Sequence, residues 1–194
     1  MSQMTKRALE ASLKNLLLRK PLNKITVSDI AMDCGINRMT FYYHFKDIYE
    51  LVEWSCQEDA GRALAEKKTY ETWEEGFLQI FHAVRENKPF IMNVYRCVSR
   101  ERVERYLSPL TDRLLLNVVE ERAEGMSVRT EDKEWIARVY AYILIGVMLD
   151  WIAGEMQEDP TVLVHRLAMV IHGNVTSALG RFEANGGLLS KQSE

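Results

Sequence analysis

The chain has 194 residues, 47% of them hydrophobic and 27% charged, with a formal net charge of −3, which is typical of a globular protein of one large or two small domains. Its three cysteines are odd in number and widely spaced, which argues against a disulfide framework or a CxxC metal site and favours a reducing compartment. The longest uncharged apolar run, between Arg138 and Asp150, is too short to span a bilayer, and the N-terminus does not resemble a signal peptide. We therefore expect a cytoplasmic protein with no membrane partner.

The N-terminal quarter is basic and its pattern is helical. Up to Tyr49 there are eight Lys and Arg residues and four Asp and Glu residues. The remaining 145 residues contain 17 Lys and Arg and 24 Asp and Glu. A first helix is expected over about 3–19, ended by Pro21. Two short helices follow over about 26–34 and 37–45. The charge asymmetry predicts a module that faces an anion, joined to a module with another task.

The two short helices have the features of a helix-turn-helix. Ala31 provides the small residue where they cross, and Gly35 provides the turn between them. Thr26 and Asp29 form a capping pair that opens the first. On the second, Phe41 and Phe45 are four residues apart and define the buried side.

The opposite side of the second short helix carries donors and large side chains: Met39, Thr40, Tyr42 and Tyr43, with Arg38 and His44 on the flanks. Aromatic residues at helical spacing usually belong to a core. Here, however, the aromatics fall on opposite faces of one helix, and exposed tyrosines are unfavourable unless something docks on them. Hydroxyl, guanidinium and imidazole groups, and the following Lys46, are donors that a phosphate or a base edge can use.

The rest of the chain is also expected to be helical. We predict a helix over about 47–68, one opened by a capping box at Thr72 and running to Asn87, and one with Pro89 in its first turn. Pro109 is expected to break or kink the stretch 103–122. The last two helices are expected over about 130–157 and 160–185, followed by a frayed tail at 189–194.

The helix expected over 130–157 is apolar on nearly all sides. Its apolar residues are Trp135, Ile136, Val139, Tyr140, Ile143, Leu144, Val147, Met148, Trp151 and Ile152. A helix that is apolar all round must be covered all round. One chain of this length can hardly supply that cover, so a partner subunit is expected.

The segment from Thr26 to Tyr49 resembles the DNA-binding domain of TetR-family transcriptional regulators. The resemblance lies in Ala31, Gly35, the run Thr-Phe-Tyr-Tyr-His-Phe at 40–45 and Lys46-Asp47, and it is specific over about 5–54. Within the family, residues 22–30 and 45–49 are similar to the subgroup that contains activators of dihydroxyacetone kinase operons.

This resemblance implies an all-α fold: an N-terminal three-helix helix-turn-helix DNA-binding domain at 1–48 and a C-terminal helical bundle for dimerisation and ligand binding at 49–188. It implies that Arg38, Met39 and Tyr43 face base edges. It implies that phosphates are held by Thr26, Ser28, Thr40, Tyr42, His44 and Lys46. We therefore expect a homodimer on a palindromic double-stranded DNA operator, modulated by a small-molecule or protein effector at the C-terminal domain.

Several alternatives stay open. The chain could be a helical adaptor or coactivator with weak or no DNA binding of its own. Asp150 is either a buried carboxylate in a ligand cavity or a dimer-seam residue paired with an arginine, and Cys97 is either a structural thiol or an oxidant sensor beside arginines. His165 and His172 are seven residues apart, a spacing that metal pairs do not favour. No HExxH, GxSxG, P-loop or GxGxxG motif is present, so neither an enzyme nor a cofactor is expected.

Overall fold

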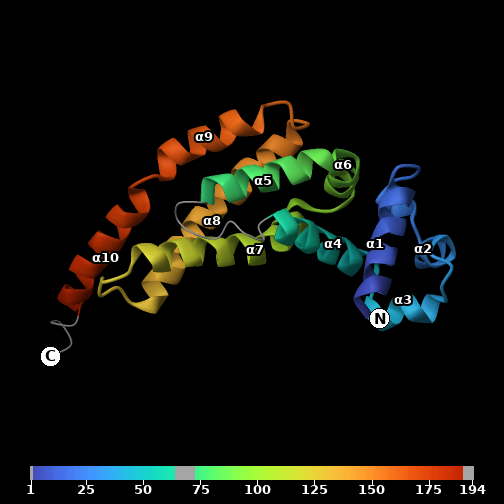
Figure 1. Cartoon of the computed structure of the whole chain (residues 1–194), viewed down its shortest axis with the longest axis horizontal. Coiled ribbons are helices and arrows are strands. Elements are labelled where there is room, and N and C mark those ends of the chain that lie inside the picture. The colour runs from blue at the N-terminus through green and yellow to red at the C-terminus, as the bar shows by residue number, and fades with distance from the viewer. Residues whose placement is uncertain (1, 64–72, 190–194) are drawn as a thin grey trace.

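The computed structural model describes residues 2–63 and 73–189, and every regular element within them is helical (Figure 1). In chain order the elements are α1 (Ser2–Leu17), the 3-10 turn η1 (Leu22–Lys24), α2 (Val27–Asp33), α3 (Arg38–His44), α4 (Ile48–Ala63), α5 (Trp73–Glu86), α6 (Lys88–Cys97), α7 (Arg100–Arg122), α8 (Thr130–Ala153), α9 (Pro160–Ile171) and α10 (Asn174–Leu189). The expected all-α fold is confirmed.

Two clusters of buried side chains organise these helices. Figure 1 shows α1, α2 and α3 grouped at one end of the molecule, with α4 leading from them into the bundle of α5–α10. The N-terminal cluster joins Leu9, Ile30 and Phe41 to Leu51 of α4 and also includes Phe90 of α6. The larger C-terminal cluster is built from α5 and α7–α10, with one residue of α6. The N-terminal helices therefore share a core with α4 and α6, which fixes their position against the bundle.

The local signals of the helix-turn-helix are present as expected. The Thr26 hydroxyl accepts the backbone N–H of Asp29, and the Asp29 carboxylate accepts the N–H of Thr26, forming a reciprocal capping box. Gly35 has φ +67°, the left-handed conformation that glycine adopts at no steric cost. The Asn37 side chain accepts the N–H of Met39 and caps the start of α3.

Three expectations about the later helices differ from the structure. Of the break or kink expected at Pro109, the break does not occur: α7 is continuous through Pro109, because its extensive packing against α8 outweighs one lost hydrogen bond. The helix expected over 160–185 is divided at Gly173, whose φ of +77° ends the helical path. α10 then continues beyond Asn185 to Leu189, since glycine disfavours a helix without forbidding it. Three expectations fall on residues that the structure does not describe: the last part of the helix expected over 47–68, the capping box at Thr72, and residues 190–194 of the expected tail.

Two segments, Thr130–Ala153 and Pro160–Asn185, are long and apolar enough by composition to cross a membrane. Half of the most apolar window of the first is buried inside the protein, and the second is divided between α9 and α10. Two helices of this kind are weak evidence for a membrane protein, because buried core helices have the same length and composition.

Candidate nucleic-acid interface

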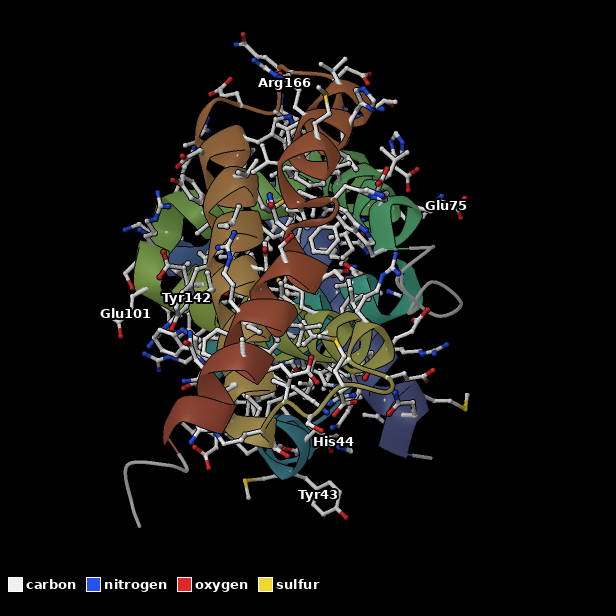
Figure 2. All side chains as sticks on the ribbon, turned by 90° about the vertical axis from the view of Figure 1, so that its left-hand side faces the viewer. Tyr43, His44, Glu75, Glu101, Tyr142 and Arg166 are labelled. Atoms are coloured by element: carbon white, nitrogen blue, oxygen red, sulfur yellow. The ribbon has the colours of Figure 1, made fainter. Side chains whose placement is uncertain are left out.

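α3 has one buried face and one exposed face. Phe41 and Phe45 are buried in the N-terminal cluster, as the sequence predicts. On the other side Met39 is 71% exposed and Tyr43 is 83% exposed, and Tyr42 is also exposed. Figure 2 shows Tyr43 projecting from the lower end of the molecule, with His44 beside it. The exposed face thus presents large side chains that no part of the described chain covers.

The predicted contact residues of α3 lie together on this surface. Arg38 is exposed at the first position of the helix, and Lys46 is exposed just after its end. Thr40 and His44 are half-buried, and the His44 ring packs edge-on against Tyr43 with centroids 5.0 Å apart. The backbone N–H of Lys46 donates to the Glu50 carboxylate at 2.5 Å, which fixes the chain where it leaves α3. Their individual roles toward bases and phosphates remain predictions.

The N-terminus of α2 is more constrained than the sequence suggests. Thr26 and Ser28 are both exposed, but the Thr26 hydroxyl already donates to Asp29 at 2.8 Å. Lys20 lies 2.9 Å from the same carboxylate. Hydrogen bonds from Lys20 and then from Thr26 lower the pKa of Asp29 to about 2, so that the carboxylate stays charged and paired. A phosphate contact by Thr26 remains a prediction and requires its hydroxyl to change partner.

One cation close to α3, Lys6, was not predicted from the sequence. Lys6 of α1 is half-buried, with its ammonium 5.3 Å from the centre of the Phe45 ring and 5.7 Å from that of Trp54. The three residues come from α1, from the end of α3 and from α4, so no local pattern connects them. Lys6 adds positive charge close to the end of α3.

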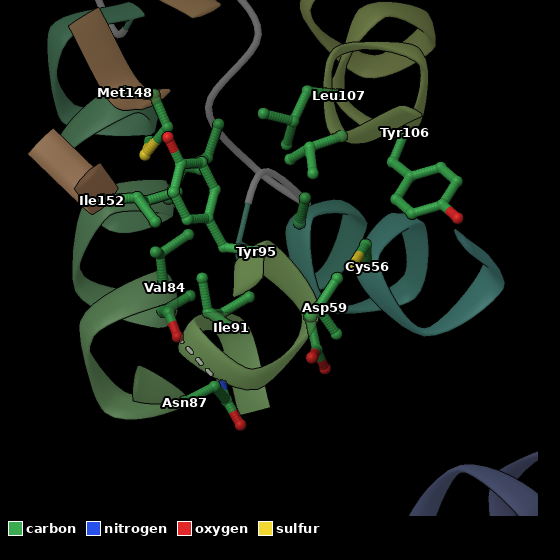
Figure 3. A pocket seen from close by; sticks show the side chains of 15 residues that line it. Cys56, Asp59, Val84, Asn87, Ile91, Tyr95, Tyr106, Leu107, Met148 and Ile152 are labelled. Atoms are coloured by element: carbon green, nitrogen blue, oxygen red, sulfur yellow. Dashed lines mark hydrogen bonds between the residues drawn. The ribbon is translucent and has the colours of Figure 1, made fainter. Parts of the chain in front are cut away.

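A second feature that escaped the sequence is a small cavity in the C-terminal bundle, enclosed by α4, α5, α6, α7 and α8 (Figure 3). Its volume is about 50 Å³. Its walls are apolar and include Val84, Ile91, Leu107 and Met148. The cavity is large enough for more than one water molecule but smaller than a typical ligand pocket.

The polar groups at the cavity wall are neutral or turned outward. Burial raises the pKa of the Cys56 thiol to about 12, and burial raises the pKa of Tyr106 to about 12. The Tyr106 hydroxyl has no hydrogen-bond partner among the described residues. The Asp59 carboxylate points out of the cavity in Figure 3, and it pairs with Lys14 at 2.8 Å and with Arg62.

Other candidate residues take ordinary positions. Asp150 is not a buried carboxylate in a cavity: its side chain is 76% exposed in the single chain and pairs with Arg100 of the same chain at 3.2 Å, and its place at a dimer seam stays a prediction. Cys97 is half-buried, with its sulfur 3.7 Å from the Asn93 side-chain oxygen. His165 and His172 are exposed. Within residues 2–63 and 73–189 no group of three or more His, Cys, Asp or Glu side chains could hold a metal ion.

Comparison with known proteins gives matches over both parts of the chain. Residues 10–53 match the profile of bacterial regulatory proteins of the tetR family, and residues 71–173 match a transcriptional regulator C-terminal region of the TetR type. The DhaS activator of the dhaKLM operon from Lactococcus lactis is 27% identical over 94 residues, which are 48% of this chain and 50% of that protein. The chain is thus matched to about half the length of this relative.

Solved structures show the same fold. A dihydroxyacetone kinase operon activator DhaS superposes with a TM-score of 0.66 and 20% identity over 92% of this chain and 98% of that one. FadR from Thermus thermophilus, a TetR family transcriptional repressor in complex with lauroyl-CoA, superposes with a TM-score of 0.61 and 15% identity over 87% of this chain and 94% of that one.

Proposed function

Because the chain belongs to the TetR family of bacterial regulatory proteins, we propose that it is a cytoplasmic, sequence-specific DNA-binding regulator without enzymatic activity. In this proposal residues 1–48 bind DNA, and residues 49–188 carry the effector site and the dimer interface. Two copies act together on a palindromic operator, since two-fold protein symmetry matches two-fold DNA symmetry.

The observation that carries the proposal is the exposed face of α3. Met39 and Tyr43 of α3 are largely exposed, while Phe41 of the same helix and Phe45 at its C-cap are buried. Exposed side chains of this size favour association with a partner. Their neighbours Arg38 and Lys46 are cations, which indicates an anionic partner such as a DNA duplex.

A homodimer is supported by the outer face of α8. Trp135, Val139, Tyr142 and Ile143 are exposed and recur at helical spacing along α8. Val162, Met169 and Val170 of α9 are exposed as well. Figure 2 looks onto the side of the molecule formed by α8 and α10, where Tyr142 projects from the surface. Exposed apolar side chains gathered in this way are expected at a subunit interface.

The cavity between α4 and α8 is our proposed effector site. Its walls are apolar and its one carboxylate, Asp59, is already paired outside it, so an uncharged and apolar small molecule fits its chemistry. At about 50 Å³ the cavity must widen to admit even a single aromatic ring. Met148, an unbranched side chain at the wall, is suited to make that space.

A matched pair of probes tests the effector site. Toluene and benzoate have similar shapes, but only benzoate is charged. We expect toluene to raise the midpoint of thermal unfolding and benzoate to leave it unchanged, because a carboxylate would lose its hydration in the cavity. Stabilisation by benzoate alone would contradict the proposed ligand class.

DNA binding separates this proposal from a helical adaptor. We expect binding to random duplex DNA at low salt, with an affinity that falls steeply as salt rises because counterions are released. A chain that binds no duplex at 50 mM salt would favour the adaptor. Light scattering at micromolar concentration tests the dimer, and a monomer there would contradict it.

A further inference from the structure

The Asn93 side chain joins α6 of the bundle to the N-terminal helices. Its Nδ2 donates to the backbone carbonyls of Leu17 at 3.1 Å and Lys20 at 3.4 Å. Its Oδ1 accepts the backbone N–H of Leu22 at 2.9 Å. One side chain thus contacts the end of α1, the turn after it and the start of η1.

Two of the backbone groups that Asn93 contacts, the carbonyl of Leu17 and the N–H of Leu22, lack partners within their own helices. The last carbonyls of a helix receive no N–H from the next turn. Backbone turns satisfy the carbonyls of Asn15 and Leu16, whereas Leu17 receives its donor from Asn93. Leu22 is the first residue of η1, and its N–H is likewise unpaired within the element. A carboxamide is suited to this junction because it carries both donors and an acceptor.

The opposite face of α6 forms part of the cavity wall. Ile91, Val94 and Tyr95 line the cavity, and in Figure 3 Ile91 and Tyr95 lie beside Val84 of α5. Lys88, the first residue of α6, donates to the backbone carbonyl of Glu155 at 2.7 Å within the bundle. α6 is therefore held between the cavity on one side and the end of α1 on the other.

We infer that Asn93 is a positioning residue, through which occupancy of the cavity changes the placement of the DNA-binding helices. A helical segment of ten residues moves as a unit, so pressure on Ile91 and Tyr95 also displaces Asn93. A shift of its amide changes the hydrogen bonds at the end of α1 and the start of η1. This inference rests on the proposed function, because it needs both DNA binding and a cavity that responds to occupancy.

A double-mutant cycle tests the inference without a known effector. Val84→Phe places a ring in the cavity against α6 and acts as a built-in occupant. The affinity for the best duplex selected from randomised DNA is measured by fluorescence anisotropy for the wild type, Val84→Phe, Asn93→Ala and the double variant. We expect Val84→Phe to change the affinity about fivefold or more in the wild-type background, and less than about twofold in the Asn93→Ala background.

Lys88→Ala is the control, because it removes a side-chain hydrogen bond of α6 that stays within the bundle. In that background Val84→Phe should keep its full effect. An equal effect of Val84→Phe in the wild-type and Asn93→Ala backgrounds would overturn the inference, as would no effect in the wild type. If the wild type selects no duplex at all, the proposed function itself fails, and the two failures are thereby distinguished.

Hydrogen exchange gives a second test that keeps Asn93 in place. The amide of Leu22 is protected by the Asn93 oxygen, so a displacement of α6 should expose it. We expect faster exchange in the segment 18–24 of Val84→Phe than of the wild type, with circular dichroism confirming that both are folded. Unchanged exchange in this segment would overturn the inference even if Asn93→Ala does not fold.

Discussion

The Lys14 ammonium lies 2.8 Å from the Asp59 carboxylate, which joins α1 to the part of α4 that borders the cavity. Lys14 also pairs with Glu10 at 2.6 Å, and its ammonium lies 5.4 Å from the centre of the Phe90 ring. Glu10 is buried and Arg62 contacts both carboxylates, so the four charged groups form one network between the N-terminal helices and α4.

This network predicts a pH-dependent contribution to stability. Burial lowers the pKa of Lys14, but hydrogen bonds and charges of Asp59 and Glu10 outweigh it and raise the pKa above 10.5. The contribution is therefore complete below pH 10.5 and is lost as the pH rises through the raised pKa. Lys14→Met keeps the apolar stem and should lower the free energy of unfolding by about 1–2 kcal/mol at pH 7.

Urea unfolding of both proteins at pH 7, 9 and 11 checks this prediction. The difference between wild type and Lys14→Met should be equal at the first two pH values and smaller at the third. A difference that is absent at pH 7, or that grows toward pH 11, would contradict the assignment.

Tyr106 offers a test of packing at the junction of the two clusters. Its side chain is buried, and its hydroxyl finds no partner among the described residues. Removing an unsatisfied buried hydroxyl is stabilising or neutral, so Tyr106→Phe should raise the free energy of unfolding by up to about 1 kcal/mol. Thermal unfolding measures it. A loss of more than about 1 kcal/mol would mean that the hydroxyl is hydrogen-bonded in solution, for example to a water molecule.

Tyr42→Ala and Lys46→Ala test the predicted phosphate contacts. Both side chains are exposed, so neither substitution should unfold the protein. Each should weaken binding to all duplexes by a similar factor, and Lys46→Ala should reduce the slope of affinity against salt by about one. Arg113→Ala, an exposed cation on α7, is the control. Unchanged affinity of both variants for the best duplex would show that the DNA-facing surface lies elsewhere.

The dimer interface is tested by Tyr142→Glu on the exposed face of α8. Tyr142 is 65% exposed in the single chain, so a charge there should leave the fold of one subunit intact. It should weaken association, because the carboxylate would be buried without a partner between subunits. Sedimentation at micromolar concentration should show a monomer for Tyr142→Glu and a dimer for Leu18→Glu, which alters an exposed leucine after α1. A Tyr142→Glu dimer as tight as that of the wild type would place the interface on another face.

The helix-turn-helix was predictable because its signals are local. The Thr26–Asp29 cap, the turn at Gly35 and the four-residue spacing of Phe41 and Phe45 each depend on residues a few positions apart. The same holds for the start of α9, where Asp159 caps the helix ahead of its first-turn proline.

The parts that escaped prediction depend on tertiary contacts. The cavity walls come from helices distant in sequence, and the hydrogen bond between Asn93 and Leu17 joins residues 76 positions apart. The arginine that pairs with Asp150 could not be identified from the sequence, because Arg100 lies 50 residues away. The division at Gly173 was missed because the apolar spacing continues on both sides of it. Periodicity identifies a face, but not what packs against it.

Arg38 is the residue on which sequence preference is expected to depend most. It is exposed at the first position of α3, where recognition helices contact base edges. A guanidinium can read guanine through two hydrogen bonds, worth roughly 1–3 kcal/mol of discrimination. Arg38→Ala should therefore relax the preference at one symmetric pair of base positions, beyond any uniform loss of affinity.

Selection from randomised duplex DNA, carried out in parallel with the wild type and Arg38→Ala, tests the central claim most directly. The account predicts that the wild type enriches a palindrome and that Arg38→Ala enriches the same palindrome with one symmetric pair of positions relaxed. Coinciding profiles with only a lower affinity would make Arg38 a phosphate contact. A wild-type pool no richer in any sequence than the starting DNA would contradict sequence-specific DNA recognition by α3.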